Sequence, residues 1–235
     1  MVAQVLVQFS EVNEVVGAEI RTFLLERSRV TSTNSANERA YHIMYQVVIG
    51  TPLVGLPVDK VNYLSMSGCT TIDGVDDKKE FDDVSKAMGT VGMSSDDTSN
   101  VWQCIAALML LGNISFGSGD TGKVSDTAVM KKASDMLGIG DVQEMLEKRS
   151  ITVGGETTKI DLNPQQALLS RDAVVKIVFA RMFTFIVNRM NKVTSNREKQ
   201  KRYIGLLDVY GFEFFDTNSF EQLCINFANE KLQQF

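Results

Sequence analysis

The sequence is poor in the residues that build metal sites and disulfide scaffolds. It has one histidine, His42, and three cysteines among 235 residues. Cys69, Cys104 and Cys224 are far apart in the chain, odd in number and form no CxxC pair. This pattern indicates reduced thiols in a cytosolic protein and excludes a disulfide framework. With a single histidine, a structural metal site is not expected either.

Basic charge and long hydrophobic runs are also lacking. The net charge is −5 and the pI is near 5.0, so the chain lacks the basic balance that is typical of nucleic-acid-binding proteins. The most apolar helical stretch, residues 173–187, is interrupted by Lys176 and Arg181 and should not span a bilayer. The N-terminal MVAQVLVQFSE has no basic segment of the kind that opens a signal peptide. We therefore expect a soluble cytoplasmic protein with no nucleic-acid partner and no membrane span.

The sequence does contain enough apolar residues for a core, and most of them follow helical spacing. Hydrophobic residues make up 44% of the chain, whose length allows one large or two small domains. Helices are predicted between capping residues and glycine stops: from the Ser35–Glu38 capping box to about residue 48, over 76–88 before Gly89, from Ser94 to near Gly112, over 126–137 before Gly138, over 164–192, and from the cap at 217–219 onward.

Strand signals are confined to the two ends of the chain and one hairpin. Residues 2–9 and 15–25 are rich in β-branched side chains, and residues 203–209 form a continuous apolar run that is typical of a buried central strand. Strands so far apart could pair only within one sheet, so we predict a fold that is mainly α with a partial β-sheet. Residues 151–160 carry β-prone arms around a Gly-Gly pair, which predicts a two-residue hairpin.

A glycine-rich stretch, GSGDTGKVS at residues 117–125, resembles the phosphate-binding P-loop. Gly117, Gly122 and Lys123 match the three fixed residues among the first seven positions of the G-x-x-x-x-G-K-[ST] pattern. Val124 stands where the Mg²⁺-binding hydroxyl belongs, and Ser125 comes one residue late. A P-loop follows a strand, whereas this stretch follows a predicted helix. An ordinary surface loop is therefore favoured over a nucleotide site.

A second phosphate-related pattern is LLDVYGFE at residues 206–213. Asp208 at the end of a strand could hold Mg²⁺ directly or through water, and the Gly211 N–H could approach a γ-phosphate because no side chain intervenes. The D-x-x-G pattern alone is weak, since Asp135–Gly138 matches it where Gly138 is predicted to stop a helix. The strand before Asp208 and the capped helix after it separate the two matches.

The C-terminal block LLDVYGFEFFDTNSFEQLCINFANEKLQQF closely resembles the second switch and relay helix of the myosin motor head, an α/β P-loop NTPase. The stretches FLLERSRV, NERAYHIMYQ, LGNISF and RDAVVKIVFARMF are similar to the same family in the same order, so the resemblance covers nearly the whole chain. It implies transducer strands of the central sheet in 1–30, a helical upper actin-binding subdomain in 31–202 with an actin-facing hairpin at 150–162, a sheet strand and second switch in 203–213, and a truncated relay helix in 214–235.

The resemblance assigns roles to the second switch. Asp208 would lie near Mg²⁺ through water, and Gly211 would donate its N–H to the γ-phosphate of ATP. Glu213 would pair with an arginine of the first switch, closing the pocket and helping to orient the attacking water. In the relay helix, the packed stripe is predicted to consist of four residues: Phe220, Leu223, Cys224 and Phe227.

The resemblance also implies an actin-facing surface. Its expected contacts are Lys123 in the variable loop and, in the hairpin, Ile151, Val153, Glu156 and Lys159. Glu156 lies sixteen positions before Asp172, where the family has an acidic or a phosphorylatable residue. An acidic residue at this position implies that the loop is negatively charged without phosphorylation by a kinase. The residues alone do not decide between these roles and a simpler interpretation, in which Glu156 is an ordinary solvated turn residue and Lys123 is an ordinary solvated lysine.

The chain departs from the family pattern at both ends. The family's phosphate loop GESGAGKT and first switch normally precede FLLERSRV, while the converter, the lower actin-binding half and the lever arm follow the relay helix. No stop signal precedes Phe235, so the last helix is expected to be cut. ATP and Mg²⁺ are thus expected only in the intact motor, and no ATPase activity is expected from this chain alone.

The expected partners are actin filaments and the remaining motor-domain segments, with light chains binding only through the missing lever arm. A cytoskeleton-associated location follows from the resemblance. The alternative is a non-catalytic module that derives from a myosin head and binds actin or another partner.

Overall fold

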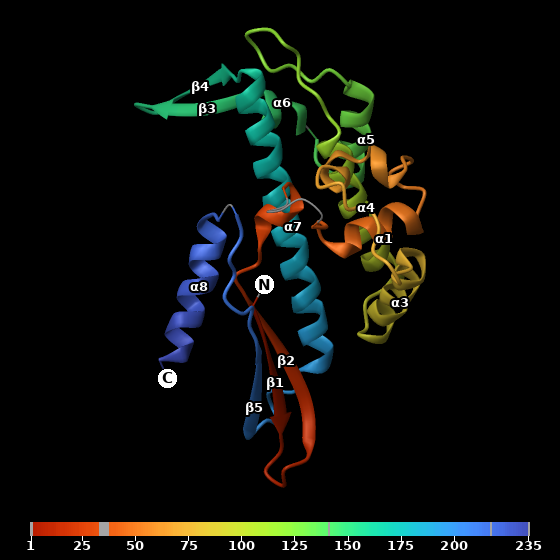
Figure 1. Ribbon diagram of the computed structural model, residues 1–235, viewed down its shortest axis with the longest axis vertical. Helices are drawn as coiled ribbons and strands as arrows, with labels where there is room; N and C mark the ends of the chain where they lie inside the picture. The colour runs from red at the N-terminus through yellow and green to blue at the C-terminus, as the bar shows by residue number, and fades with distance from the viewer. Residues whose placement is uncertain (1, 33–37, 141, 217, 235) are drawn as a thin grey trace. The chain divides into compact units, whose positions relative to one another are not determined.

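The computed structural model describes residues 2–32, 38–140, 142–216 and 218–234 (Figure 1). The chain divides into two compact units. Unit one contains Met1–Arg27, Ser85–Thr98 and Ala180–Phe235, and unit two contains Ser28–Val84 and Ser99–Phe179. The fold is mixed α/β with small antiparallel sheets, as the sequence predicts in outline.

Unit one is built on a three-stranded antiparallel sheet. The strands β1 (Val2–Phe9), β2 (Val15–Phe23) and β5 (Arg202–Asp208) lie in the order β2-β1-β5 (Figure 1). Strands from the two ends of the chain therefore do pair, with Leu6 of β1 opposite Gly205 of β5. The interpretation of residues 203–209 as a buried central strand is wrong for this chain. All of β5 is exposed at the sheet edge, because the described residues supply neither a further strand nor cover for its two apolar faces.

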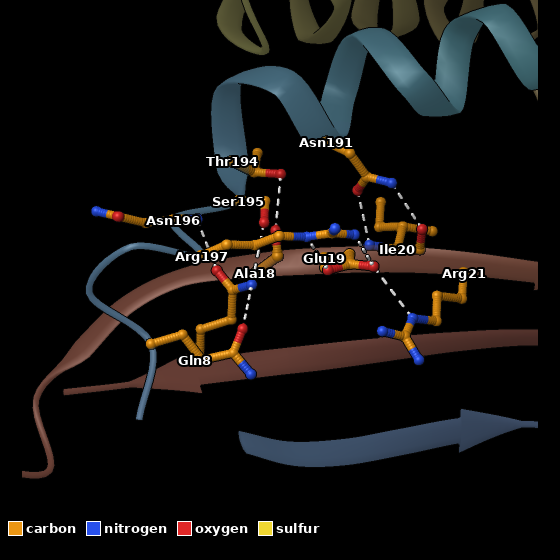
Figure 2. Close-up of polar contacts among 11 residues, drawn as sticks. Gln8, Ala18, Glu19, Ile20, Arg21, Asn191, Thr194, Ser195, Asn196 and Arg197 are labelled. Atoms are coloured by element: carbon orange, nitrogen blue, oxygen red, sulfur yellow. Dashed lines mark hydrogen bonds and ion pairs between the residues drawn. The ribbon is translucent and has the colours of Figure 1, made fainter. Parts of the chain in front are cut away.

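The outer edge of β2 is closed by side chains of helix α7 (Pro164–Thr194) (Figure 2). The Ile20 N–H donates to Asn191 Oδ1 and the Asn191 amide donates to the Ile20 carbonyl, both at 2.7 Å. Thr194 Oγ1 donates to the Ala18 carbonyl at 3.0 Å. These side chains take the place of a neighbouring strand, so the end of α7 is held in register with β2.

Two buried polar side chains extend this junction. Gln8 is fully buried, and its amide donates to Ser195 Oγ at 3.0 Å and to Gln200 Oε1 at 2.9 Å. Glu19 accepts two hydrogen bonds from the Arg197 guanidinium, at 2.9 and 3.1 Å (Figure 2). Arg197 thereby holds the pKa of the Glu19 carboxyl below its ordinary value, although burial acts in the opposite direction.

Helix α8 (Phe220–Gln233) follows a loop after β5 in unit one. Its cap is Ser219, whose N–H donates to the Gln222 side chain at 2.8 Å. Thr217, also predicted to cap this helix, lies outside the described residues. The predicted packed stripe is wrong: three of its residues are exposed and Cys224 is half-buried, while Gln222 and Ile225 are buried. The exposed residues are Phe220, Leu223 and Phe227, at 74%, 64% and 61%.

Unit two is mainly helical, with one two-stranded hairpin. Its elements include α1 (His42–Gly50), η2 (Val58–Lys60), α2 (Asn62–Ser65), most of α4 (Ser95–Gly112), α5 (Thr127–Leu137), α6 (Val142–Glu147) and the first half of α7. The 3₁₀ turn η1 (Arg27–Val30) and α3 (Asp77–Thr90) cross the unit boundary. Helix α4 forms the centre of the core, because every residue from Ile105 to Gly112 is buried. Gly112 allows this packing, since a Cβ there would lie 2.4 Å from the Tyr63 ring.

Most helix limits agree with the prediction, and one stop signal is wrong. Helix α5 is capped by Asp126, which accepts from Val129 N–H, and it ends at Gly138 with φ +64° as predicted. Helix α3 continues through Gly89, and the chain turns instead at Gly92, whose φ is +77°. Ser35 of the predicted capping box before α1 lies outside the described residues.

Candidate functional site

The D-x-x-G motif lies where strand β5 gives way to a loop. Asp208 is the last residue of β5 and is exposed, as is Gly211, whereas Val209 and Glu213 on either side are half-buried. A Cβ built on Gly211 would meet no heavy atom within 4 Å, and its backbone needs no left-handed conformation. The folded chain therefore does not require glycine at this position, so a requirement for glycine would have to come from a ligand.

Glu213, the last of the three predicted switch residues, is attached to helix α8. Its N–H donates to Asn226 Oδ1 and its carbonyl accepts from the Asn226 amide, both at 2.8 Å. The Gln222 amide donates to the Glu213 carboxylate at 3.3 Å. One asparagine thus satisfies both backbone groups of Glu213, so a displacement of this residue would be felt by α8.

The glycine-rich stretch is a loop, as predicted, and its lysine is engaged elsewhere. Lys123 Nζ lies 3.0 Å from the Glu147 carboxylate and 3.6 Å from that of Asp161. The second Glu147 oxygen accepts from the Val124 N–H at 3.0 Å. The hydrogen bond to Glu147 raises the pKa of Lys123. The lysine and an amide of this loop are therefore both bound to one protein carboxylate.

Burial of Glu147 acts to raise its pKa, but its hydrogen bonds outweigh burial. They come from the Val124 N–H, from the Gln143 amide at 2.8 Å and from Lys123, and the pKa of the carboxyl lies below its ordinary value. The main chain of Glu147 also accepts from the Leu162 N–H at 2.8 Å, and the Leu162 carbonyl accepts from the Gly122 N–H at 2.6 Å. Glu147 therefore links the glycine-rich loop to the base of the hairpin.

The predicted hairpin consists of β3 (Lys148–Val153) and β4 (Glu156–Asp161), which project beyond α6 as a two-stranded arm (Figure 1). Gly154 and Gly155 have φ of +61° and +89°, the pair of left-handed residues that a tight turn of this kind requires. Val153, at the tip, is 74% exposed and lies opposite Glu156. Lys159 is paired with Glu144 at 2.7 Å.

The predicted site residues thus fall into two groups. Asp208, Gly211 and Glu213 follow one another along one segment of unit one, and the five expected actin contacts lie on the loop and hairpin of unit two. Sequence reasoning missed three residues that fix these groups: Gln222, Asn226 and Glu147. A signal existed for Gln222, because Ser219 and Gln222 form the S-x-x-Q pattern of a capping box. Asn226 and Glu147 gave no local signal.

In the described part of the chain, no cluster of three or more histidine, cysteine, aspartate or glutamate side chains could hold a metal ion. No described helix is long and apolar enough to cross a membrane.

The comparisons with known proteins agree over nearly the whole chain. The family model described as myosin head (motor domain) matches residues 4–235. The chain is 38% identical to unconventional myosin-Vc of Homo sapiens and 41% identical to myosin-K heavy chain of Dictyostelium discoideum, in each case over 97% of its own length. It is 40% identical to myosin-13 of Arabidopsis thaliana over the same share.

The share of each relative that is matched is much smaller. The chain spans 14% of the human protein, 16% of the Arabidopsis protein and 28% of the Dictyostelium protein. A family match over residues 4–235, together with the D-x-x-G segment after β5 and its link to α8, establishes the family. The chain belongs to the myosin head (motor domain) family.

Proposed function

We propose that this chain is the part of an actin-based motor head that carries the second switch, the start of the relay helix and an actin-facing hairpin. The motor as a whole couples ATP hydrolysis to movement along actin filaments in the cytoskeleton. In this proposal residues 1–30 contribute transducer strands, 31–202 form the upper actin-binding subdomain, 203–213 hold the switch, and 214–235 begin the relay helix.

The observation that carries the proposal is the arrangement after β5. An exposed carboxylate at the strand end, Asp208, fits a water-mediated contact to Mg²⁺, and the uncrowded backbone at Gly211 fits the close approach of a phosphate. In the motor, these residues would contact the Mg²⁺ ion and the terminal phosphate of ATP. When bound, ATP supplies the phosphoanhydride bond that is hydrolysed. Lys123 is bound to Glu147, so the lysine and hydroxyls on the phosphates would belong to other segments of the motor.

The residues of this chain would then contribute by holding the phosphate and the attacking water in place. Gly211 would donate its N–H toward the terminal phosphate, and the Glu213 carboxylate would pair with an arginine of the first switch and help to orient the attacking water. Because Asn226 binds both backbone groups of Glu213, movement of the switch would carry α8 with it. This link is the proposed first step from phosphate sensing to the lever arm.

The second part of the proposal concerns actin. The hairpin presents apolar side chains and one carboxylate near its tip, with Ile151 37% and Val153 74% exposed beside Glu156. We assign these three residues to direct contact with actin. Lys123 and Lys159 lie at the actin-facing surface as well, where their ion pairs with Glu147 and Glu144 would also set the position of the loop and the hairpin.

A chimeric motor tests the proposal. Residues 4–235 of this chain replace the matching stretch of the Dictyostelium relative, and actin-activated ATPase activity and actin-dependent sedimentation of the purified head are measured. The proposal predicts ATPase activity that actin stimulates and ATP-sensitive actin binding. A chimera that is folded but neither hydrolyses ATP nor binds actin would contradict it. The matched control is the unaltered Dictyostelium head.

A further inference from the structure

The two faces of the β3–β4 hairpin carry different side chains. Successive residues of a strand point to opposite faces, so the pairing of Lys148 with Asp161 and of Val153 with Glu156 assigns each residue to a face. One face, called here the ion-paired face, consists of polar and charged residues: Lys148, Ser150, Thr152, Thr157, Lys159 and Asp161. The other, called the contact face, includes the apolar residues of the hairpin: Arg149, Ile151, Val153, Glu156, Thr158 and Ile160.

Ion pairs join the first of these faces to the rest of unit two. The Glu144 carboxylate of α6 lies 2.7 Å from Lys159 Nζ and 3.9 Å from Lys148 Nζ. The Asp161 carboxylate lies 3.6 Å from Lys123 Nζ. In the part of the chain that the structure describes, the ion pairs of the hairpin all use the ion-paired face. The contact face is thereby left for a partner.

The Glu144 pair with Lys159 reaches beyond the base of the hairpin. Main-chain hydrogen bonds hold the base, where the Leu162 N–H donates to the Glu147 carbonyl, and α6 runs directly into β3. Lys159 lies two residues closer to the tip than Asp161, which marks the base. The ladder between β3 and β4 holds the strands to each other but does not fix their direction relative to α6. A contact from α6 to Lys159 can fix that direction.

We infer that Glu144 is a positioning residue for actin binding. By holding Lys159 and Lys148, it fixes the direction of the hairpin and so presents the contact face. This inference rests on the function proposed above, in which Ile151, Val153 and Glu156 touch actin. All three lie on the contact face, whereas Lys159 lies on the ion-paired face. Lys159 therefore acts on actin through the direction of the hairpin.

The exposure of the pair sets the size of the effect. Lys159 is 53% and Glu144 36% exposed, and an exposed ion pair changes an equilibrium by up to about fivefold. A hairpin that samples several directions binds more weakly, in proportion to the fraction that has the competent direction. Salt screens exposed charges. Loss of Glu144 should therefore weaken actin binding by about two- to fivefold at low salt, and less at high salt.

The direction of the hairpin is measured on the purified chain without actin. Spin labels on genetically encoded ketone side chains replace Thr158 on β4 and Lys131 on α5, both of which are exposed, so the three cysteines stay untouched. Double electron–electron resonance should give a narrow distance distribution at low salt that broadens at high salt. Glu144→Lys should broaden it at low salt, and Glu144→Lys/Lys159→Glu should narrow it again.

Recovery in the double variant excludes misfolding as the cause of the broadening, because a second substitution would not refold a misfolded chain by restoring one charge pair. The same distribution in the original chain and in Glu144→Lys would overturn the inference. So would a broadened distribution that the charge exchange with Lys159 leaves unchanged.

The consequence for actin is measured in the chimeric head with Glu144→Gln. The actin concentration at half-maximal ATPase activity should rise by about two- to fivefold at low salt while kcat stays unchanged, and the difference should shrink at high salt. Asp82→Asn, which removes a carboxylate from the exposed pair with Lys78 on α3, is the matched control and should change neither value.

An actin requirement that stays unchanged or falls in Glu144→Gln would overturn the positioning role. A chimera that binds no actin even with Glu144 in place would contradict the proposed function instead. The distance measurement separates the two failures, because it needs neither actin nor nucleotide.

Discussion

Glu147 offers the most informative single perturbation in unit two. Its side chain is 7% exposed and accepts from the Val124 N–H, the Gln143 amide and Lys123. Replacing it by glutamine keeps an acceptor for Val124 and removes the charge, whereas replacing it by alanine removes every acceptor. The two variants therefore separate the contribution of the charge from that of the buried hydrogen bond.

The expected magnitudes follow from these contacts. In Glu147→Ala the buried Val124 N–H loses its partner, which costs about 1–3 kcal/mol. Lys123 is 51% exposed and can return to water, so the loss of its ion pair adds little. We expect a loss of about 1–3 kcal/mol in the free energy of unfolding for Glu147→Ala and about 1 kcal/mol for Glu147→Gln. Glu144→Gln, at a more exposed pair, should change stability by about 0.5 kcal/mol or less.

Denaturant unfolding at pH 7 measures these differences, and hydrogen exchange locates them. Exchange should rise in the loop 117–125 of Glu147→Ala, whose Val124 and Lys123 lose their side-chain partner, and should rise less in the hairpin, because its base is joined to the main chain of Glu147. The pKa of Glu147 is lowered on folding, so its charge stabilises the fold above the ordinary value of 4.5. The gap between the original chain and Glu147→Gln should therefore close as the pH falls below that value. Exchange in the loop 117–125 that does not rise would refute the role of the Glu147 side chain as the anchor of this loop.

Three further outcomes are expected. Gly17→Ala should cost about 1–3 kcal/mol in denaturant unfolding, because its Cβ would lie 2.6 Å from the Thr194 carbonyl oxygen; an unchanged midpoint would contradict this packing. Arg197→Ala should cost about 1 kcal/mol at pH 7, and this cost should shrink as the pH falls from 4.5 through the lowered pKa of Glu19; an effect independent of pH would argue against the ion pair. The glycine-rich loop of the purified chain should not bind ATP, because Lys123 is paired with Glu147; ATP binding in calorimetry that Lys123→Ala abolishes would contradict this.

The parts of the fold that depend on neighbouring residues could be predicted from the sequence. The Gly154-Gly155 turn and the Gly138 helix stop each involve only a few consecutive residues, and both are present. The error at Gly89 has a local cause too, because a helix tolerates an exposed glycine at modest cost and the true stop at Gly92 was close by.

What could not be predicted depends on residues far apart in the chain. Helix α8 has more than one apolar side, and its buried side includes Gln222 because that amide bonds to Glu213. The junction between Asn191 and Ile20, and the link from Glu147 to Lys123, join segments that no periodicity connects. The assignments of Asp208, Gly211 and Glu213 rest on resemblance, and their arrangement after β5 supports them.

The central claim is that the backbone of Gly211 is open in order to receive a phosphate. The most direct test is the actin-activated ATPase rate of the chimeric head with Gly211→Ala, beside Gly89→Ala as the matched control. A Cβ at either glycine meets no protein atom within 4 Å, and neither position needs a left-handed backbone, so both variants should fold. The account predicts that Gly211→Ala lowers the rate by about 100-fold or more and that Gly89→Ala leaves it unchanged. Equal rates for the two variants would contradict the claim.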